Sequence, residues 1–337
     1  MLGLFVLACV PRGMASGSII TVDEVYHWFG RAEKFLAALR AGDYAATNLI
    51  GHPGVTTMWL GATGIRLHEW LTGLGWIDGS DPALRRALLR LPVAIVTALS
   101  VALAYPLLRR LLDRRIALLA ALLWAADPFL IAHSQLLHTD ALVTTFINLG
   151  LLAALLAFRI EEGRAGRNNP IRWPLLIASA VAGGLGLLTK STAVLLPVLV
   201  GVIALLTGFT QRDPARHWTR RWPMLPLLAW GLVAASVWFV LWPATWVDLP
   251  GALWAMYVQA TQDGGTPHAW GNFFMGRAVA DPGPLFYPVA VALRLTPWTL
   301  IGLLAAVGFA VLRRRTLPHW PALSLLLLFV GLFMLAL

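Results

Sequence analysis

Long apolar runs separated by short polar segments dominate the sequence. A helix that crosses the hydrocarbon core of a bilayer needs about 20 mostly apolar residues, and runs approaching that length follow one another along most of the chain. The predicted spans are 91–108, 116–132, 140–158, 175–189, 193–209, 223–242, 287–311 and 318–337, with a shorter apolar stretch at 1–15. The pattern therefore predicts an all-α fold, a polytopic transmembrane helical bundle of about 8–9 spans.

Two apolar stretches are too long to be single helices. Residues 175–209 would extend about 52 Å at 1.5 Å per residue, which is more than one crossing requires, so we expect two helices that turn at 189–192. We expect residues 116–158 to turn in the same way around the segment AHSQLLHTD, at 132–140. Both turns then face the same side of the membrane.

Arginine clusters between the apolar runs orient the predicted spans. Only 12% of the 337 residues are charged, although the net charge is +10, whereas soluble domains carry about 25% charged residues. Alternating the spans places four clusters on one side, which the positive-inside rule assigns to the cytoplasm. These clusters lie within 109–115, 159–172, 212–221 and 313–315. Because the basic residues fall in short clusters between apolar runs and form no basic surface interleaved with aromatic residues, they favour membrane anchoring over nucleic-acid binding.

Two larger segments fall on the opposite, extracytoplasmic side. The first, 21–90, contains two stretches with helical periodicity, 31–40 and 55–74, that suit amphipathic helices at the membrane interface. The second, 243–286, is rich in Trp, Gly and Pro. We find no internal repeat or low-complexity linker, which favours a single membrane-embedded domain over 1–337. The short first span and the apolar run at the end of the chain indicate that the first span and the C-terminal region are incomplete.

Three acidic residues at the extracytoplasmic ends of predicted helices are candidates for chemistry. Asp23 and Glu24 are adjacent, and neighbouring carboxylates are one way in which proteins tune a general base. Asp140 begins a predicted span, where an acidic side chain costs about 2.5–3.5 kcal/mol. Helix capping is the alternative in each case, and Thr21 and Glu24 match a capping box.

Several cations on the same side could meet an anionic ligand. Lys190 stands between two apolar runs, and Lys34 is the only other lysine in the sequence. A compact ammonium in that position suits a phosphate, although snorkelling towards lipid headgroups also accounts for it. Further candidates are His52, His268 and Arg294.

Two histidines, His133 and His138, lie close to Asp140 in the sequence. Their spacing does not match a zinc site, so water-facing imidazoles are the simpler interpretation. Acids and cations on one face of an apolar chain indicate a substrate that is both anionic and lipid-like, and a polyprenyl-phosphate sugar fits that description. The single cysteine, Cys9, excludes an intramolecular disulfide and a thiolate metal cluster.

Six short motifs occur in a familiar order between residues 20 and 300. They are D-E-x-Y at 23–26, H-P at 52–53, R-L-P at 90–92, T-D-A at 139–141, G-L-x-x-L-T-K at 184–190 and an F-Y-x-P-V-A-like start at 286–290. In these motifs the chain resembles the polytopic GT-C glycosyltransferases of the protein O-mannosyltransferase and lipid A aminoarabinose transferase type, glycosyltransferase family 39.

The resemblance implies an inverting transfer of a mannosyl, other hexosyl or pentosyl group from a polyprenyl-phosphate donor to a hydroxyl of a protein, lipid or glycan. Asp23 would be the general base, with Glu24 and Asp140 positioning the acceptor or the sugar. Lys190, His52 and Arg294 would bind the donor phosphate.

The remaining expectations concern the substrate, the metal and the location. Tyr26, Pro53, His138 and His268 are expected to contact substrate. The resemblance also leaves room for a divalent cation, with no ligands assigned and no other cofactor expected. The predicted location is the cell (plasma or inner) membrane, multi-pass, with the active site on the extracytoplasmic face and no nucleic-acid partner.

Two other functions remain as alternatives from the residues alone. A transporter or lipid flippase tends to place ionisable residues near the bilayer midplane, often with internal repeats, whereas the acids here lie at the predicted boundary. A non-catalytic membrane scaffold of envelope assembly would not require Asp23, Asp140 and Lys190 to lie close together. Their positions in the folded chain therefore discriminate between a transferase and a scaffold.

Overall fold

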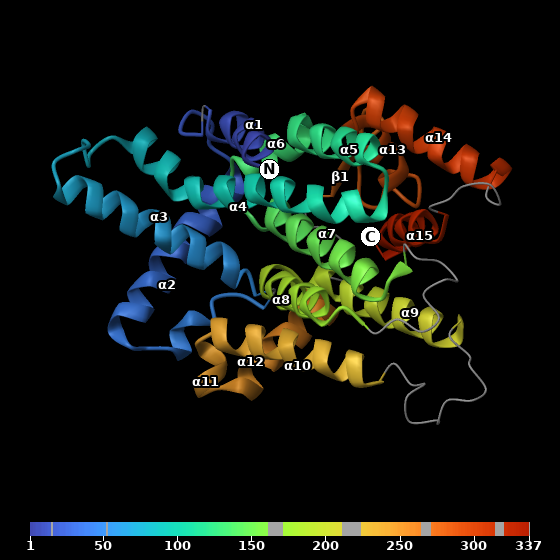
Figure 1. The fold of residues 1–337 in the computed structure, drawn as a ribbon. Coiled ribbons are helices and arrows are strands. Elements are labelled where there is room, and N and C mark those ends of the chain that lie inside the picture. Colours follow the sequence, from blue (N-terminus) through green and yellow to red (C-terminus); the bar gives the residue numbers. More distant parts are fainter. Residues whose placement is uncertain are drawn as a thin grey trace. The chain divides into compact units, whose positions relative to one another are not determined.

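The computed structural model of the chain is almost entirely helical (Figure 1). It describes residues 1–14, 16–51, 53–160, 171–210, 224–263, 271–313 and 320–336. These residues form two compact units, Met1–Met256 and Tyr257–Leu337, with the division inside the predicted second extracytoplasmic segment. The interpretation of 1–337 as a single domain stays a prediction.

The first unit contains the helices that position the site. They are α1 (Leu2–Gly13), η1 (Glu24–Trp28), α2 (Phe29–Ala41), η2 (Ala45–Thr47), α3 (Val55–Gly73), α4 (Pro82–Leu111), α5 (Arg114–Ala126), α6 (Pro128–Ser134), α7 (Thr139–Ala157), α8 (Trp173–Thr189), η4 (Ser191–Val194), α9 (Leu195–Thr210), α10 (Met224–Leu241), α11 (Ala244–Val247) and most of α12 (Leu249–Val258). The predicted helices at 31–40 and 55–74 are confirmed as α2 and α3. The turn predicted at 189–192 is confirmed between α8 and η4.

The second unit contains η6 (Gln259–Asp263), the strands β1 (Asn272–Phe274) and β2 (Arg277–Val279), and the helices α13 (Phe286–Arg294), α14 (Pro297–Arg313) and α15 (Trp320–Ala336). The strands form an antiparallel hairpin in which Phe274 pairs with Arg277. Met275 and Gly276 between them have φ values of 50° and 81°. Positive φ at both turn positions is the type I′ geometry that matches the twist of a hairpin. This hairpin departs from the all-α expectation.

In the part of the chain that the structure describes, three helices are individually long and apolar enough to cross a membrane: α4, α7 and α10. A fourth candidate is the pair α5 and α6, which passes the same test together but bends by 54°. Shorter apolar helices lie in α1, α8, α9, α14 and α15, the one in α9 extending back over η4. The predicted helical membrane bundle is thus supported, while the number of 8–9 spans remains a prediction.

Two predicted spans are broken in the structure, which corrects their boundaries. The run 116–132 divides at Asp127 into α5 and α6, and the run 287–311 divides at 295–296 into α13 and α14. Asp127 Oδ1 accepts from the N–H of Leu130 at 2.9 Å, and Thr296 Oγ1 accepts from the N–H of Thr299 at 3.2 Å. Each capping residue is followed by proline, which begins a helix well but cannot continue the previous one.

The central layer of the first unit is built from α4, α7 and α8, which lie side by side (Figure 1). Helix α10 packs on α8, where glycines allow a close approach: a Cβ on Gly183 would lie 2.5 Å from Cζ2 of Trp230. Trp230 donates its Nε1–H to Ser179 Oγ at 3.0 Å across the same contact. Small residues and interhelical hydrogen bonds are the usual means of helix association in membranes.

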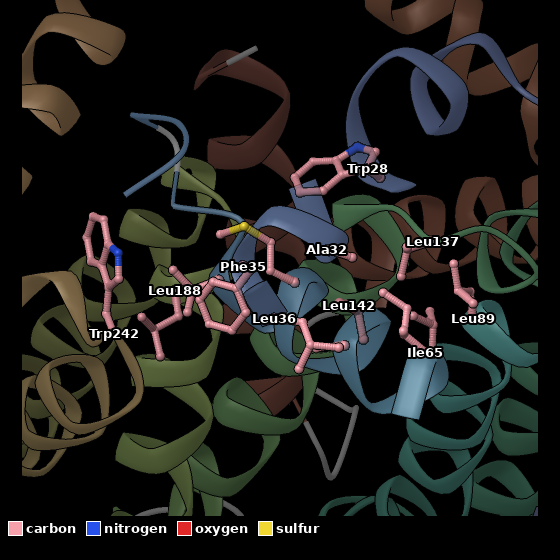
Figure 2. Packing of buried hydrophobic residues seen from close by; sticks show 14 of the residues in the cluster. Trp28, Ala32, Phe35, Leu36, Ile65, Leu89, Leu137, Leu142, Leu188 and Trp242 are labelled. Carbon is pink, nitrogen blue, oxygen red and sulfur yellow. The ribbon is translucent and has the colours of Figure 1, made fainter. Parts of the chain in front are cut away.

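The larger of the apolar clusters in the first unit lies next to the ends of these helices. It draws buried side chains from η1, α2, α3, α4, α7, α8 and the segments next to α7 and α10, including Trp28, Phe35, Leu137, Leu188 and Trp242 (Figure 2). Because Trp28 and Leu137 belong both to this core and to the segments that carry Glu24 and His138, the core fixes the backbone of the site.

Candidate functional site

A buried ion pair anchors the segment that carries the two adjacent acids. The guanidinium of Arg90 on α4 binds the Glu24 carboxylate through two bonds, Nε to Oε1 and Nη2 to Oε2, each 2.7 Å long. The side chains of Arg90 and Glu24 are 1% and 0% exposed. Bidentate arginine–carboxylate pairs are strong and geometrically specific, so this pair fixes η1 against α4.

Two further groups donate hydrogen bonds to Glu24, so each of its carboxylate oxygens accepts two bonds. The hydroxyl of Thr21 donates to Oε2 at 2.7 Å, and the backbone N–H of Leu137 donates to Oε1 at 2.8 Å. Arg90 in turn donates to the carbonyl of Ile19 at 2.8 Å and to that of Ser16. The pair therefore joins three segments: the chain before η1, helix α4 and the turn that precedes α7.

The neighbouring acid, Asp23, points to the surface. Its side chain is 63% exposed, and its Oδ2 lies 3.6 Å from Nε2 of His138. The two acids of the D-E pair thus differ in environment: Glu24 is buried and bonded, whereas Asp23 is accessible. Since a general base must reach the substrate hydroxyl, Asp23 is the better placed of the two.

A second ion pair continues the same row of residues. His138 is the N-cap of α7, and its Nδ1 lies 3.5 Å from Oδ2 of Asp140. The Asp140 Oδ1 accepts from Nζ of Lys190 at 2.8 Å, across the gap between the start of α7 and the end of α8. Asp23, His138, Asp140 and Lys190 therefore form a continuous line of charged or ionisable groups at one end of the helical layer.

The end of α8 is fastened to the start of α3. Thr189, just before Lys190, shares a hydrogen bond of 2.6 Å between its hydroxyl and that of Thr56. Its carbonyl accepts from the N–H of Gly54 at 3.2 Å. Gly54 has a φ of 58°, a left-handed conformation that glycine adopts without strain. The first turn of α3 therefore lies beside Lys190, and the N-terminus of a helix favours anions.

Arg31 on α2 borders the exposed carboxylate. Its Cζ lies 5.0 Å from the centre of the Trp28 ring, a cation–π contact. Partial burial lowers the pKa of the Arg31 guanidinium, and the nearby negative charge of Asp23 opposes that shift. Asp23 thus has a cation in its surroundings beyond the histidine.

The structure brings together most of the residues that the sequence singles out. Asp23, Glu24, His138, Asp140 and Lys190 converge, Tyr26 is 76% exposed on the same helical turn as Asp23, and Pro53 is buried next to Gly54. A non-catalytic scaffold would not require Asp23, Asp140 and Lys190 to lie close together, so their proximity favours a transferase.

The other predicted ligands are not tested by the structure. Arg294 ends α13 in the second unit, and His52 and His268 lie outside the described residues. Within the described ranges, His, Cys, Asp and Glu side chains form no group of three that could hold a metal ion. The divalent cation suggested by the resemblance remains a prediction without ligands.

Sequence reasoning missed two contributors. Arg90 was noted only as part of the R-L-P motif, and Arg31 only as the start of an amphipathic stretch. An arginine directly before a predicted span was nevertheless a signal, because a charge at the edge of an apolar helix favours a partner.

Comparison with known proteins links this geometry to a family. Residues 85–242 match the family model described as dolichyl-phosphate-mannose-protein mannosyltransferase. The matched range includes Arg90, His138, Asp140 and Lys190, and it begins after Asp23.

The chain is also similar to curated aminoarabinose transferases. It is 34% identical over 250 residues to the undecaprenyl phosphate-alpha-4-amino-4-deoxy-L-arabinose arabinosyl transferase of Pseudomonas paraeruginosa, covering 71% of this chain and 39% of that protein. A second enzyme of this name, from Pseudomonas fluorescens, is 30% identical over 256 residues, covering 71% of this chain and 38% of that protein. The chain thus spans about two fifths of the length of these relatives.

Two solved structures share the fold. The protein O-mannosyltransferase Pmt1–Pmt2 complex of S. cerevisiae bound to the sugar donor superposes with a TM-score of 0.53 at 21% identity, covering 75% of this chain and 33% of that chain. The apo oligosaccharyltransferase of Archaeoglobus fulgidus gives a TM-score of 0.51 at 14% identity, covering 96% of this chain and 46% of that chain. The fold, the family match and the curated relatives agree. The chain is similar in sequence to protein O-mannosyltransferases and aminoarabinose transferases, and together these comparisons support a glycosyltransferase of the GT-C type.

Proposed function

We propose that the chain transfers a sugar from a polyprenyl-phosphate donor to an acceptor hydroxyl, at the extracytoplasmic face of the cell membrane. The observation that carries the proposal is the row from Asp23 through His138 and Asp140 to Lys190, which places an exposed carboxylate and a cation at the same end of an apolar bundle. The relatives support the donor class, since undecaprenyl phosphate and dolichyl phosphate, named for them, are both polyprenyl phosphates. The sugars in those names differ, and the proposal therefore covers the donor lipid rather than one sugar.

In the proposed reaction Asp23 is the general base. The acceptor oxygen attacks the anomeric carbon while its proton passes to the Asp23 carboxylate, and the bond from that carbon to the phosphate oxygen breaks on the opposite side. The electron pair leaves with the phosphate, so the configuration inverts in one displacement. A positioned base of this kind contributes about 10²–10⁴-fold to the rate.

Lys190 and the first turn of α3 are the proposed donor-phosphate site. The side chain of Lys190 is 35% exposed, and its ammonium can stabilise the charge that develops on the departing phosphate. The bonds from Thr189 to Thr56 and to Gly54 hold α3 beside it. His52 precedes this turn in the sequence and belongs to the same proposal.

For Glu24 we propose a positioning role. Its carboxylate accepts from Arg90, Thr21 and Leu137 and is fully buried, which supports a role in fixing the Asp23 backbone rather than contact with the acceptor. Tyr26, exposed beside Asp23, is the proposed acceptor contact on η1.

The test is transfer of radiolabelled sugar in membranes charged with polyprenyl-phosphate sugars, comparing the wild type with Asp23→Asn. The variant keeps the shape of the side chain but cannot take a proton, so transfer should fall by about 10²-fold or more. Asp43→Asn is a matched control, because Asp43 is an exposed carboxylate in the same segment that only caps a local turn. Equal transfer by wild type and Asp23→Asn would exclude Asp23 as the general base. No transfer by the wild type would contradict the proposed function.

A further inference from the structure

The two acids of the D-E pair meet two consecutive residues of the turn before α7. Glu24 accepts from the backbone N–H of Leu137, and Asp23 faces the imidazole of the next residue, His138. The first contact is buried and structural, and the second is open to the surface. The pairing places a histidine against the proposed base.

The hydrogen bonding of His138 decides which nitrogen carries its proton. Its Nδ1 accepts from the backbone N–H of Asp140 at 3.3 Å. An accepting nitrogen has no proton of its own, so a neutral imidazole with this bond carries its proton on Nε2. Nδ1 also lies 3.5 Å from Oδ2 of Asp140, and a ring protonated on both nitrogens likewise has an N–H at Nε2. Nε2 is the atom that lies 3.6 Å from Asp23 Oδ2. The ring therefore presents a donor to the Asp23 carboxylate.

Apart from the nearby positive charge of Arg31, Asp23 has little else to fix its orientation. Its side chain makes no capping hydrogen bond at η1, and His138 is the one side chain within ion-pair distance of its carboxylate among the residues that the structure describes. A carboxylate on the surface with one partner is free to turn when that partner is removed. Small displacements of a catalytic group can cost about 10²-fold in rate.

The imidazole itself is held in place. Trp28 approaches it edge-on, with ring centres 5.8 Å apart and planes at 78°. Trp28 is buried in the apolar core and is covered by the Arg31 guanidinium. The ring of His138 is thus fixed by its Nδ1 bond and by packing, as a positioning residue must be.

We propose that His138 is the positioning residue for Asp23, an inference that rests on the proposed function. Its Nε2 lies 3.6 Å from Oδ2 of Asp23, and the N–H attracts that oxygen electrostatically. The other carboxylate oxygen is left to take the proton as the acceptor oxygen bonds to the anomeric carbon and the phosphate departs with its electron pair. The role differs from direct substrate contact, because His138 acts through Asp23.

Two substitutions separate this role from that of the N-cap of α7. His138→Asn keeps an oxygen that can cap the helix, but its amide is too short to reach Asp23. His138→Gln places an N–H donor close to the position of Nε2 and caps less well. Positioning predicts that the glutamine variant retains more activity, whereas capping alone predicts that the asparagine variant retains as much or more.

The experiment measures kcat and the acceptor KM for both variants, with purified enzyme and a polyprenyl-phosphate sugar. We expect kcat to fall about 30–100-fold in His138→Asn and less than about 10-fold in His138→Gln, with the acceptor KM within about 3-fold of the wild type. The control is His27→Gln, an exposed histidine on the same turn as Asp23, which should behave as the wild type. In an Asp23→Asn background, His138→Asn should cause no further loss.

The following outcomes overturn the inference. Unchanged kcat in both variants would leave His138 as a cap, and a raised acceptor KM with unchanged kcat would make it a substrate contact. Equal losses in both variants, or an additional loss in the Asp23→Asn background, would contradict action through Asp23. This inference alone would be refuted if the wild type transfers sugar, Asp23→Asn is inactive and His138→Asn is unaffected. The proposed function would be refuted if the wild type itself is inactive.

Discussion

The ammonium of Lys190 lies 2.8 Å from Oδ1 of Asp140, so the cation proposed for the donor phosphate is already paired with a carboxylate. Both side chains are partly exposed, at 35% and 39%. A phosphate that binds Lys190 must therefore compete with Asp140. Because of this competition, Asp140 should affect the affinity for the donor phosphate, and this effect can be measured separately from the rate of sugar transfer.

We predict that Asp140→Asn binds undecaprenyl phosphate more tightly, by about 3–10-fold, because the amide removes a negative charge next to the site. Lys190→Gln should weaken the same binding by about 10-fold or more. Binding is measured with purified protein in detergent at fixed ionic strength, since exposed charges are screened by salt.

A double variant provides the control for this competition. If Asp140 acts through Lys190, Asp140→Asn should have no effect on phosphate binding in the Lys190→Gln background. Tighter binding in both backgrounds would mean that Asp140 repels the phosphate directly, and weaker binding in Asp140→Asn would contradict the competition.

The second prediction concerns the buried pair of Arg90 and Glu24. Arg90→Gln leaves the Glu24 carboxylate buried without its cation, a change that typically costs about 3–5 kcal/mol. We expect a large fall in the unfolding temperature of the purified protein. Limited proteolysis of the segment before η1 should also become faster, because Arg90 binds the carbonyls of Ser16 and Ile19.

Arg85→Gln is the matched control, because Arg85 lies on the same helix and pairs with Glu33 at 2.5 Å, but the two side chains are 38% and 49% exposed. Exposed pairs contribute about 0–1 kcal/mol. Similar unfolding temperatures for the two variants would show that burial of the first pair does not matter.

The helices show where sequence reasoning succeeds. The apolar runs and the length limit of a span predict the turn at 189–192 and the reversal before α7, since 35 residues of helix do not fit one crossing. The breaks at 127 and 295–296 were missed. They carried a local signal, a capping residue followed by proline, in Asp127-Pro128 and Thr296-Pro297. The residues on both sides of each break are apolar, so hydropathy predicted one continuous span despite that signal.

The site shows where sequence reasoning stops. Asp23, Asp140 and Lys190 stand out because charges are rare in an apolar chain, and the structure places them together. The different environments of Asp23 and Glu24 could not be predicted, because they depend on Arg90 and Leu137, which are distant in sequence. The contact between His138 and Asp23 has the same origin. Long-range pairings of this kind follow from the packing of α4 and α7, which no local pattern encodes.

The third prediction concerns pH and the exposed pair of Arg40 and Glu69. The hydrogen bond from Arg40 lowers the pKa of Glu69 below its ordinary value. A carboxyl whose pKa is lowered by folding contributes stability above its unfolded pKa of about 4.3 and loses it as the pH falls through the folded value. Arg40→Gln should thus lower the unfolding temperature slightly at pH 7, and the difference from the wild type should shrink below about pH 4. A gap of constant size from pH 7 to pH 3 would contradict the assignment.

The fourth prediction tests the contact between α3 and α4, which places the proposed phosphate turn. A Cβ on Gly64 would lie 2.5 Å from the carbonyl oxygen of Leu88 and 2.5 Å from Cα of Leu89. Both are backbone atoms, so Gly64→Ala must push the helices apart, and overpacking of this kind costs about 1–3 kcal/mol. Gly73→Ala is the control on the same helix, because nothing lies within 4 Å of its Cβ position. Alanine there should be neutral or stabilising by up to about 1 kcal/mol.

We expect the unfolding temperature to fall in Gly64→Ala alone. Binding of undecaprenyl phosphate should also weaken in Gly64→Ala, because α3 carries the turn beside Lys190. If Gly64→Ala lowers the unfolding temperature but leaves phosphate binding unchanged, α3 is not part of the phosphate site.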